Sequence, residues 1–475
     1  MLKKLLMIGL LGTPISGTAT PFDEKISTIA DQSSLAITIY QQDLALIKDS
    51  RSVYLDRDHN QLTWHAVSAR LQPETAFLRN ITHPAGFSIR EQNFNPDVLS
   101  PQKLLEKHVQ KPVTIIRTNP ANGQETSETA MVVTAQGGVI LKFPDRIETG
   151  IPGRLVFPAI PDGLYDKPVL TAALINPVAG KQGLVLTYLS TGLSWQADYI
   201  VELGERDDQI NLTGLATLTN RSGATYSNAR LQLVAGDLNR INRPRAASPA
   251  MLKMVAESAS DDGMQTDALF EYHRYTLQRP ATLFDNQTKQ VTFMSATRVP
   301  VHRIYLLQGE NHYYTGQYNQ AGSPQKVNVL ISFQNEGDGL GVPLPKGIMR
   351  VYKTDSHADT QYVGEDYIDH TPARAVIRLR LGHAFDLMAE KKQTDFKKLD
   401  TTPHNRHFET AYQITLKNTK KEAVTLTIHE PIPGDWTILS ESAPHQKLAA
   451  NLVEWKVNVP ADSETTVTYR VRVNL

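Results

Sequence analysis

Four side chains capable of acid–base or metal chemistry crowd the stretch QYVGEDYIDHTP, at positions 361–372. They are Glu365, Asp366, Asp369 and His370. Carboxylates and imidazole bind divalent ions or transfer protons when they converge on one point. From a regular strand they do not converge, because successive side chains point to opposite faces. Asp366 and His370 would then share one face, and Glu365 and Asp369 the other.

A simpler role for this stretch is to end a strand and shape a turn. Asp369 can accept hydrogen bonds from nearby backbone amides, and Thr371 with the proline after it favours chain reversal. Structural clusters of this kind are commoner than catalytic or metal sites. We therefore predict a turn, and keep Glu365, Asp366 and His370 as the candidates for catalysis or metal binding.

Other catalytic signatures are absent from the sequence. It contains no cysteine, no G-x-S-x-G elbow and no H-E-x-x-H motif. EGDGLGVPLPKG (336–347) resembles a nucleotide loop by its glycines, but Pro343 and Pro345 prevent the helix that phosphate binding needs. For ENHYYTGQYN (310–319) we predict a hairpin whose tyrosines face a core or an interface, with sugar stacking as the alternative. We predict no cofactor, no metal and no assigned catalytic residue.

The overall composition excludes several classes of protein. Of 475 residues, 40% are hydrophobic and 21% charged, which is typical of globular chains. Lys plus Arg equals Asp plus Glu, 49 each, so no net field attracts nucleic acid. A chain of this length predicts several domains.

The N-terminus has the pattern of a secretory signal peptide. Lys3 and Lys4 precede a short apolar run, and Gly17 and Ala19 suit a cleavage site. We predict a signal peptide over residues 1–19, cleaved near Ala19, and an exported, periplasmic product. No other apolar run is long enough to cross a membrane, so the mature chain is expected to lack a transmembrane segment.

Most of the remaining sequence alternates apolar and polar residues with a period of two. In TTVTYRVRV (465–473), valines and a tyrosine take one face and threonines and arginines the other. This pattern predicts antiparallel strands with one wet face. The first helix signal comes at Ser100, an N-cap followed by Pro101. We predict an all-β chain of several sandwich or immunoglobulin-like domains, with an inserted small barrel of SH3 type.

The predicted domains follow the turn clusters along the chain. They are an N-terminal β domain over 30–99, the small SH3-like barrel over 100–157, a central β-sandwich over 158–400, and a C-terminal immunoglobulin-like domain over 405–475. The central sandwich contains an Ala-, Ser- and Met-rich insert over 242–268, which predicts a mobile loop rather than a partner-binding helix.

Several long phrases resemble an exported bacterial family, the domain-of-unknown-function family 4139, which includes mucoidy-inhibitor-like proteins. The phrases are YLSTGLSWQADY, TNRSGATYSNARLQLVAGD and the segment from KGIMRVYKTD through QYVGEDYIDHTP. The resemblance runs from about residue 35 to 475. It implies a β-rich envelope protein and supplies no catalytic residue or cofactor. The long coiled coil of some mucoidy-inhibitor-like relatives is absent.

These observations favour a non-enzymatic binding or scaffolding protein of the cell envelope. The expected partners are an envelope protein or a polysaccharide, and not nucleic acid. Two alternatives remain open. One is an envelope hydrolase that uses carboxylates in a groove between domains. The other is a metal-dependent regulator of exopolysaccharide.

Overall fold

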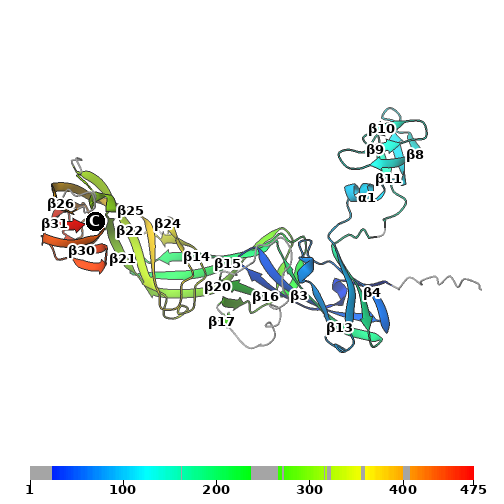
Figure 1. Ribbon diagram of the computed structural model, residues 1–475, viewed down its shortest axis with the longest axis horizontal. Helices are drawn as coiled ribbons and strands as arrows, with labels where there is room; N and C mark the ends of the chain where they lie inside the picture. Colours follow the sequence, from blue (N-terminus) through cyan, green and yellow to red (C-terminus); the bar gives the residue numbers. More distant parts are fainter. Residues whose placement is uncertain are drawn as a thin grey trace, which may run out of the picture.

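The computed structural model describes residues 24–161, 163–236, 266–269, 272–314, 316–317, 322–354, 359–399 and 407–475. The predicted signal peptide lies outside these ranges, as does the 242–268 insert except for residues 266–268. Almost all regular structure is β-strand, which confirms the all-β class. The strands form five sheets, arranged as an elongated body with one small domain projecting from it (Figure 1).

Two sheets stack face to face in the larger part of the body. One has eight strands, with β17–β18–β16–β2–β3–β13–β5 in order and β19 beside β16; the other has the order β20–β15–β14–β23–β24. The strands of the first are β2 (Gln32–Tyr40), β3 (Leu44–Leu55), β5 (Phe77–Asn80), β13 (Gly180–Ser190), β16 (Tyr226–Ala235), β17 (Thr266–Leu269), β18 (Tyr272–Thr276) and β19 (Ala281–Leu283). Those of the second are β14 (Leu193–Leu203), β15 (Gln209–Asn220), β20 (Gln287–Pro300), β23 (Gly347–Thr354) and β24 (Thr360–Ile368).

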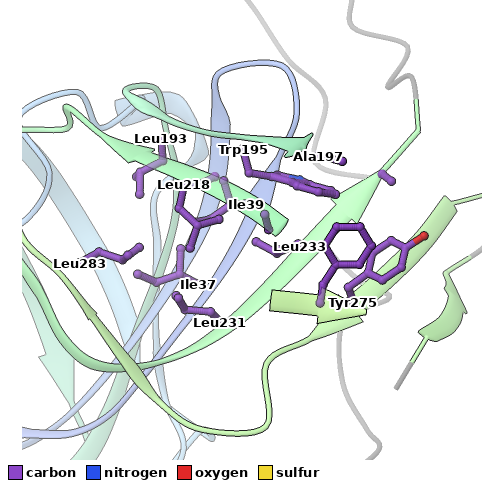
Figure 2. Close-up of a cluster of buried hydrophobic side chains, with 14 of the residues drawn as sticks. Ile37, Ile39, Leu193, Trp195, Ala197, Leu218, Leu231, Leu233, Tyr275 and Leu283 are labelled. Carbon is purple, nitrogen blue, oxygen red and sulfur yellow. The ribbon is translucent and has the colours of Figure 1, made fainter. Parts of the chain in front are cut away.

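The alternation in these strands explains the packing between the two sheets. Ile37 and Ile39 of β2 lie against Leu193 and Trp195 of β14, all in one buried cluster (Figure 2). Trp195 also donates its indole N–H to the Val234 carbonyl oxygen at 3.1 Å. This core joins strands from residues 30–99 and from 158–400, so those two ranges share a sheet and a single core.

A smaller four-stranded sheet completes the N-terminal end. It has the order β1–β4–β12–β6, formed by β1 (Glu24–Ser27), β4 (Asp58–His65), β6 (Ser88–Asn95) and β12 (Val169–Asn176). Two 3₁₀ turns, η1 (Ile29–Asp31) and η2 (Pro73–Thr75), lie nearby in the chain. In this sheet Asn95 is the register partner of Val169, so the ends of β6 and β12 are adjacent.

The small domain is inserted between those adjacent strand ends and has its own hydrophobic core. It contains α1 (Pro101–Lys107), β7 (Pro112–Thr118), β8 (Glu125–Thr134), β9 (Ile140–Lys142), β10 (Ile147–Thr149) and β11 (Arg154–Val156). The order β10–β9–β8–β7–β11 brings the last strand beside the first, but the two edges do not close into a complete barrel. As predicted, Ser100 caps the helix by accepting from the Lys103 amide.

The C-terminal end is a nine-stranded sheet that folds over its own core. Its order is β28–β31–β26–β25–β22–β21–β27–β30–β29. The strands are β21 (His302–Gln308), β22 (Ser323–Gln334), β25 (Val376–Lys398), β26 (His407–Asn418), β27 (Val424–Pro431), β28 (Asp435–Glu441), β29 (Gln446–Ala449), β30 (Leu452–Val459) and β31 (Ser463–Asn474), with the 3₁₀ turn η4 (Asn311–Tyr314). Residues 405–475 therefore share this sheet with strands from the range 302–398.

Strand β25 is long enough to enter two cores. Leu379 lies in the central core, and Leu387 lies in the C-terminal core. Its partner β22 does the same, with Phe333 in the first and Val327 in the second. A continuous antiparallel ladder therefore connects the two parts of the body.

Candidate functional site

The stretch QYVGEDYIDHTP occupies the edge strand β24 and the four residues after it. Gly364 has φ +150°, and a Cβ there would lie 2.6 Å from the Leu381 carbonyl oxygen of β25. A glycine is therefore required for β25 to approach this closely. The register also shifts beside it, between Val351 and Tyr352 of β23, which bends the strand.

The two neighbouring acids of β24 point in opposite directions. Glu365 faces outward, where its Oε2 lies 3.3 Å from Nε of Arg350. Asp366 points the other way and accepts from the Arg380 amide of β25 at 2.7 Å and from the Tyr367 amide at 2.9 Å. The Asp366 side chain thus joins β24 to β25 through the Arg380 backbone amide, and it does not share a site with Glu365.

After β24 the chain continues to Thr371, which pairs with Leu344 in an isolated antiparallel bridge, and the turn follows at residues 372–375. Asp369 accepts from the His370 amide at 2.7 Å, and the Thr371 hydroxyl donates to the Asp369 carbonyl oxygen at 2.7 Å. Nδ1 of His370 accepts from the Lys346 amide at 3.3 Å. Asp366 and His370 therefore bind different backbone amides.

Glu365 belongs instead to a group of side chains on the outward side of the five-stranded sheet. We call this group the polar face. It consists of Gln196, Asp198, Thr217, Gln290, Arg350, Tyr352, Tyr362, Glu365 and Tyr367, contributed by β14, β15, β20, β23 and β24. The opposite side of the same sheet carries core residues such as Trp195 and Met349, because alternate positions face alternate ways.

Asp198 is the centre of the polar face. Its Oδ1 accepts from Nη1 of Arg350 at 2.9 Å, and its Oδ2 accepts from the Thr217 hydroxyl at 2.6 Å. Gln196 donates to Oδ2 at 3.4 Å, and Gln290 donates to the Thr217 hydroxyl at 3.0 Å. The Asp198 side chain is only 8% exposed. This network fixes the position of Arg350, whose Nε reaches Glu365.

The electrostatics of the polar face keep both members of its central pair charged. Burial would raise the pKa of Asp198, but hydrogen bonds from Thr217 and Arg350 outweigh burial and lower that pKa. The hydrogen bond with Asp198 raises the pKa of Arg350. A carboxylate held in this way is a poor proton donor at neutral pH, so it suits binding better than general acid catalysis.

Exposed tyrosines flank the pair. Tyr362 is 54% exposed and Tyr367 is 58% exposed. The Tyr362 ring meets Tyr352 edge to face, with centroids 5.7 Å apart. Sequence reasoning missed this face, since alternation does not tell which side of a two-faced strand is buried. A usable signal is the similar order of polar residues in MRVY (349–352) and GEDY (364–367). These segments lie on neighbouring strands, where Arg350 is the register partner of Glu365.

The tyrosines at 313 and 314 have a different environment. They lie in the 3₁₀ turn η4, with Tyr314 fully buried and Tyr313 partly buried against the C-terminal core. This confirms the prediction that they face a core, although a helical turn replaces the expected hairpin. Tyr318 lies outside the described residues.

The described part of the chain offers little for other chemistry. There, no three His, Asp or Glu side chains gather in a way that would hold a metal ion. A hollow at the β20 edge is lined by residues 277–281 and 291–295, which include neither acids nor histidines. Within the same ranges, no helix has the length and apolar character to cross a membrane.

Comparison with known families agrees with the sequence resemblance. A family model described as a domain of unknown function (DUF4139) matches residues 184–475. The chain belongs to this family. The DUF4139 match begins in β13 and runs to the C-terminus, so it includes the whole polar face and the C-terminal sandwich. A search of curated proteins gave no match.

Proposed function

We propose that this DUF4139 protein is an exported, non-enzymatic binding or scaffolding protein of the bacterial cell envelope, and that the polar face binds a polysaccharide. The observation that carries the proposal is the pair of exposed tyrosines beside charged and amide groups that the Asp198 network already holds in position. An envelope protein is the alternative partner.

The chemistry of the polar face suits a sugar chain. Tyrosine rings have a flat apolar face that can stack on a sugar ring, and a hydroxyl that can hydrogen-bond. Arg350, Glu365 and Gln196 supply donors and acceptors for sugar hydroxyls. Because Asp198 holds Arg350 in place before binding, less conformational entropy is lost when a ligand arrives.

The proposed location has separate support. The basic residues Lys3 and Lys4, the apolar run after them and the small residues before Thr20 are typical of a secretory signal peptide. Fusion of residues 1–25 to a reporter that is active only in the periplasm tests this part. A reporter that stays inactive would refute export by this segment.

Binding can be tested by affinity electrophoresis in gels that contain purified capsular or exopolysaccharides. We expect at least one polysaccharide to retard the wild-type protein, and Tyr362→Ala and Tyr367→Ala to abolish the retardation. Tyr54→Ala is the matched control, because Tyr54 is 57% exposed on β3, in a different sheet. Equal loss of retardation in the control, or no effect of the two variants, would refute the assignment of the site.

The two alternatives have less support. A hydrolase needs two carboxyls placed across a groove, whereas Asp198 and Glu365 both contact Arg350. The hydrolase alternative would be favoured if the purified protein released sugars or peptides and Glu365→Gln stopped the release. A metal-dependent regulator would show a thermal midpoint that falls with EDTA and recovers with a divalent ion.

A further inference from the structure

A lysine and a glutamate meet inside the C-terminal sandwich. Nζ of Lys391 on β25 lies 2.6 Å from Oε2 of Glu430 on β27, and their side chains are 1% and 0% exposed. In the sheet order, β22 and β21 separate these two strands. The contact therefore crosses the interior of the folded sheet and is not a contact between paired strands.

The surroundings of this pair are aromatic. The ring centroids of Tyr313, Tyr412 and Tyr314 lie 4.3, 4.5 and 5.1 Å from Nζ of Lys391. The Tyr314 hydroxyl donates to Oε2 of Glu430 at 2.7 Å and lies 2.6 Å from the hydroxyl of Tyr469. Within the described residues, Oε1 of Glu430 is buried without a hydrogen-bond partner.

Backbone geometry also makes room for the carboxylate. A Cβ at Gly309 would lie 2.3 Å from Oε2, 2.5 Å from Cδ and 2.7 Å from Oε1 of Glu430. These similar distances show that the flat side of the carboxylate lies against the backbone of Gly309. Only a glycine leaves space for a carboxylate at this position.

Another deeply buried ion pair among the described residues is built differently. Asp49 and Arg51 are 7% and 1% exposed, and Asp49 accepts from Arg51, Trp64 and Gln32 with both oxygens. Arg51 also donates to the Ser27 and His65 carbonyl oxygens. That network satisfies its charges, as a structural buried pair must. The Lys391–Glu430 pair leaves an oxygen unsatisfied and sets the ammonium against rings.

From this geometry we infer that Lys391 and Glu430 join in an intramolecular amide, an isopeptide cross-link that forms after folding with loss of water. The site therefore modifies its own chain, and no cofactor or second substrate takes part. The inference is independent of the proposed binding function.

The reaction balances with the atoms present. One proton passes from Nζ to the carboxylate across the short contact, which leaves a neutral amine and a neutral acid. The nitrogen lone pair then bonds to Cδ, and the C=O electron pair moves to Oε1. That pair re-forms the C=O bond as the bond from Cδ to Oε2 breaks. Oε2, to which the Tyr314 hydroxyl donates, departs as water with a second proton from the nitrogen. The amide nitrogen keeps the third.

The environment favours each step. Burial lowers the pKa of Lys391 despite the nearby Glu430, which increases the share of nucleophilic amine. Burial and Glu430 raise the pKa of Tyr314 well above its usual value, so its hydroxyl stays protonated and can donate. Two reacting groups held together inside one fold also gain a large effective concentration. The terminal torsion of Glu430 is soft, so its carboxyl can turn to present Cδ.

The direct test is the intact mass of the purified full chain after denaturation. We expect the wild type to be lighter than its sequence mass, counted from its own N-terminus, by one water molecule. Tandem mass spectrometry of a digest should find one branched peptide that contains both Lys391 and Glu430. This peptide locates the water loss without any variant.

Three variants sharpen the test. Lys391→Arg should have its full sequence mass, because a guanidinium is not a nucleophile at neutral pH. Lys392→Arg, at the exposed neighbouring position, should keep the water loss. Tyr314→Phe should leave an unlinked fraction that the wild type lacks. A folded wild type with its full sequence mass, even after prolonged incubation, would overturn the inference, as would a water loss located elsewhere.

Discussion

Replacement of Arg350 by methionine should weaken the five-stranded sheet through Asp198. In the variant, the Asp198 carboxylate keeps the Thr217 hydroxyl at 2.6 Å but loses its only charged partner within the polar face. Breaking a fully buried pair costs about 3–5 kcal/mol, and an exposed pair about 0–1 kcal/mol. Asp198 is 8% exposed and Arg350 is 35% exposed, so we expect an intermediate loss of about 2 kcal/mol in the free energy of unfolding.

The sign of the pH dependence follows from the pKa of Asp198. The folded state lowers this pKa, so ionised Asp198 stabilises the fold. This stabilisation is fully present above the pKa of the unfolded chain and is lost as the pH falls through the pKa of the folded protein. In Arg350→Met the lowering of this pKa by Arg350 is lost, so the pKa of Asp198 lies higher than in the wild type. The destabilisation should therefore be largest at neutral pH and shrink as the pH falls through the folded-state pKa of Asp198, below which the carboxyl is protonated in both proteins.

Hydrogen exchange with peptide resolution is the suitable assay, since it reports opening of individual strands. Peptides from β14 and β23 should exchange faster in the variant at neutral pH, while those from β31 should not change. Arg154→Met is the matched control, because Arg154 and Glu125 are 66% and 51% exposed and 3.4 Å apart. A destabilisation that does not shrink as the pH is lowered, or that is as large in the control, would refute the reasoning.

Other substitutions test the remaining packing and connections. Gly364→Ala should destabilise the β24–β25 contact by about 1–3 kcal/mol, measured as faster exchange in β24; unchanged exchange would contradict the close approach to Leu381. Trp455→Ala should cost about 3–5 kcal/mol in urea unfolding, because the indole is fully buried and stacks on Tyr469 at 4.7 Å. Replacing residues 98–165 with a short glycine turn should leave the β-sheet circular dichroism signal and the thermal midpoint of the rest unchanged. Loss of that signal would show that the rest of the fold depends on the inserted domain.

Local sequence patterns predicted the elements better than their assembly. Alternation identified strands such as β31, and the Ser100–Pro101 pair located the only α-helix of the described residues, because both signals depend on neighbouring residues. The parallel pairing of β2 with β16 and of β14 with β23 depends on contacts between distant segments. A single sequence carries no local signal for such pairing.

The candidate site was likewise predictable in its local features but not in its contacts between strands. Strand periodicity correctly separated Glu365 from Asp366, but the turn lies at residues 372–375, later than the position predicted at Asp369. The partners of Glu365 could not be predicted, since Arg350 and Asp198 come from other strands whose order was unknown. Lys391 and Glu430 were also missed, because a charged residue in a strand looks solvent-facing, and Lys391 stands between Glu390 and Lys392.

The parallel pairing of β2 with β16 has a consequence for the nascent chain during translation. Thr38 and Gln232, which are hydrogen-bonded across these strands, are 194 positions apart. At about 5–20 residues per second, β2 leaves the ribosome roughly 10–40 seconds before its partner. The inserted domain, with its short-range contacts, can fold within that interval. The hairpin of β2 and β3 meanwhile lacks the partner strand that covers Ile37, Ile39 and Ile47 in the folded protein, so it presents an apolar surface that a chaperone can bind.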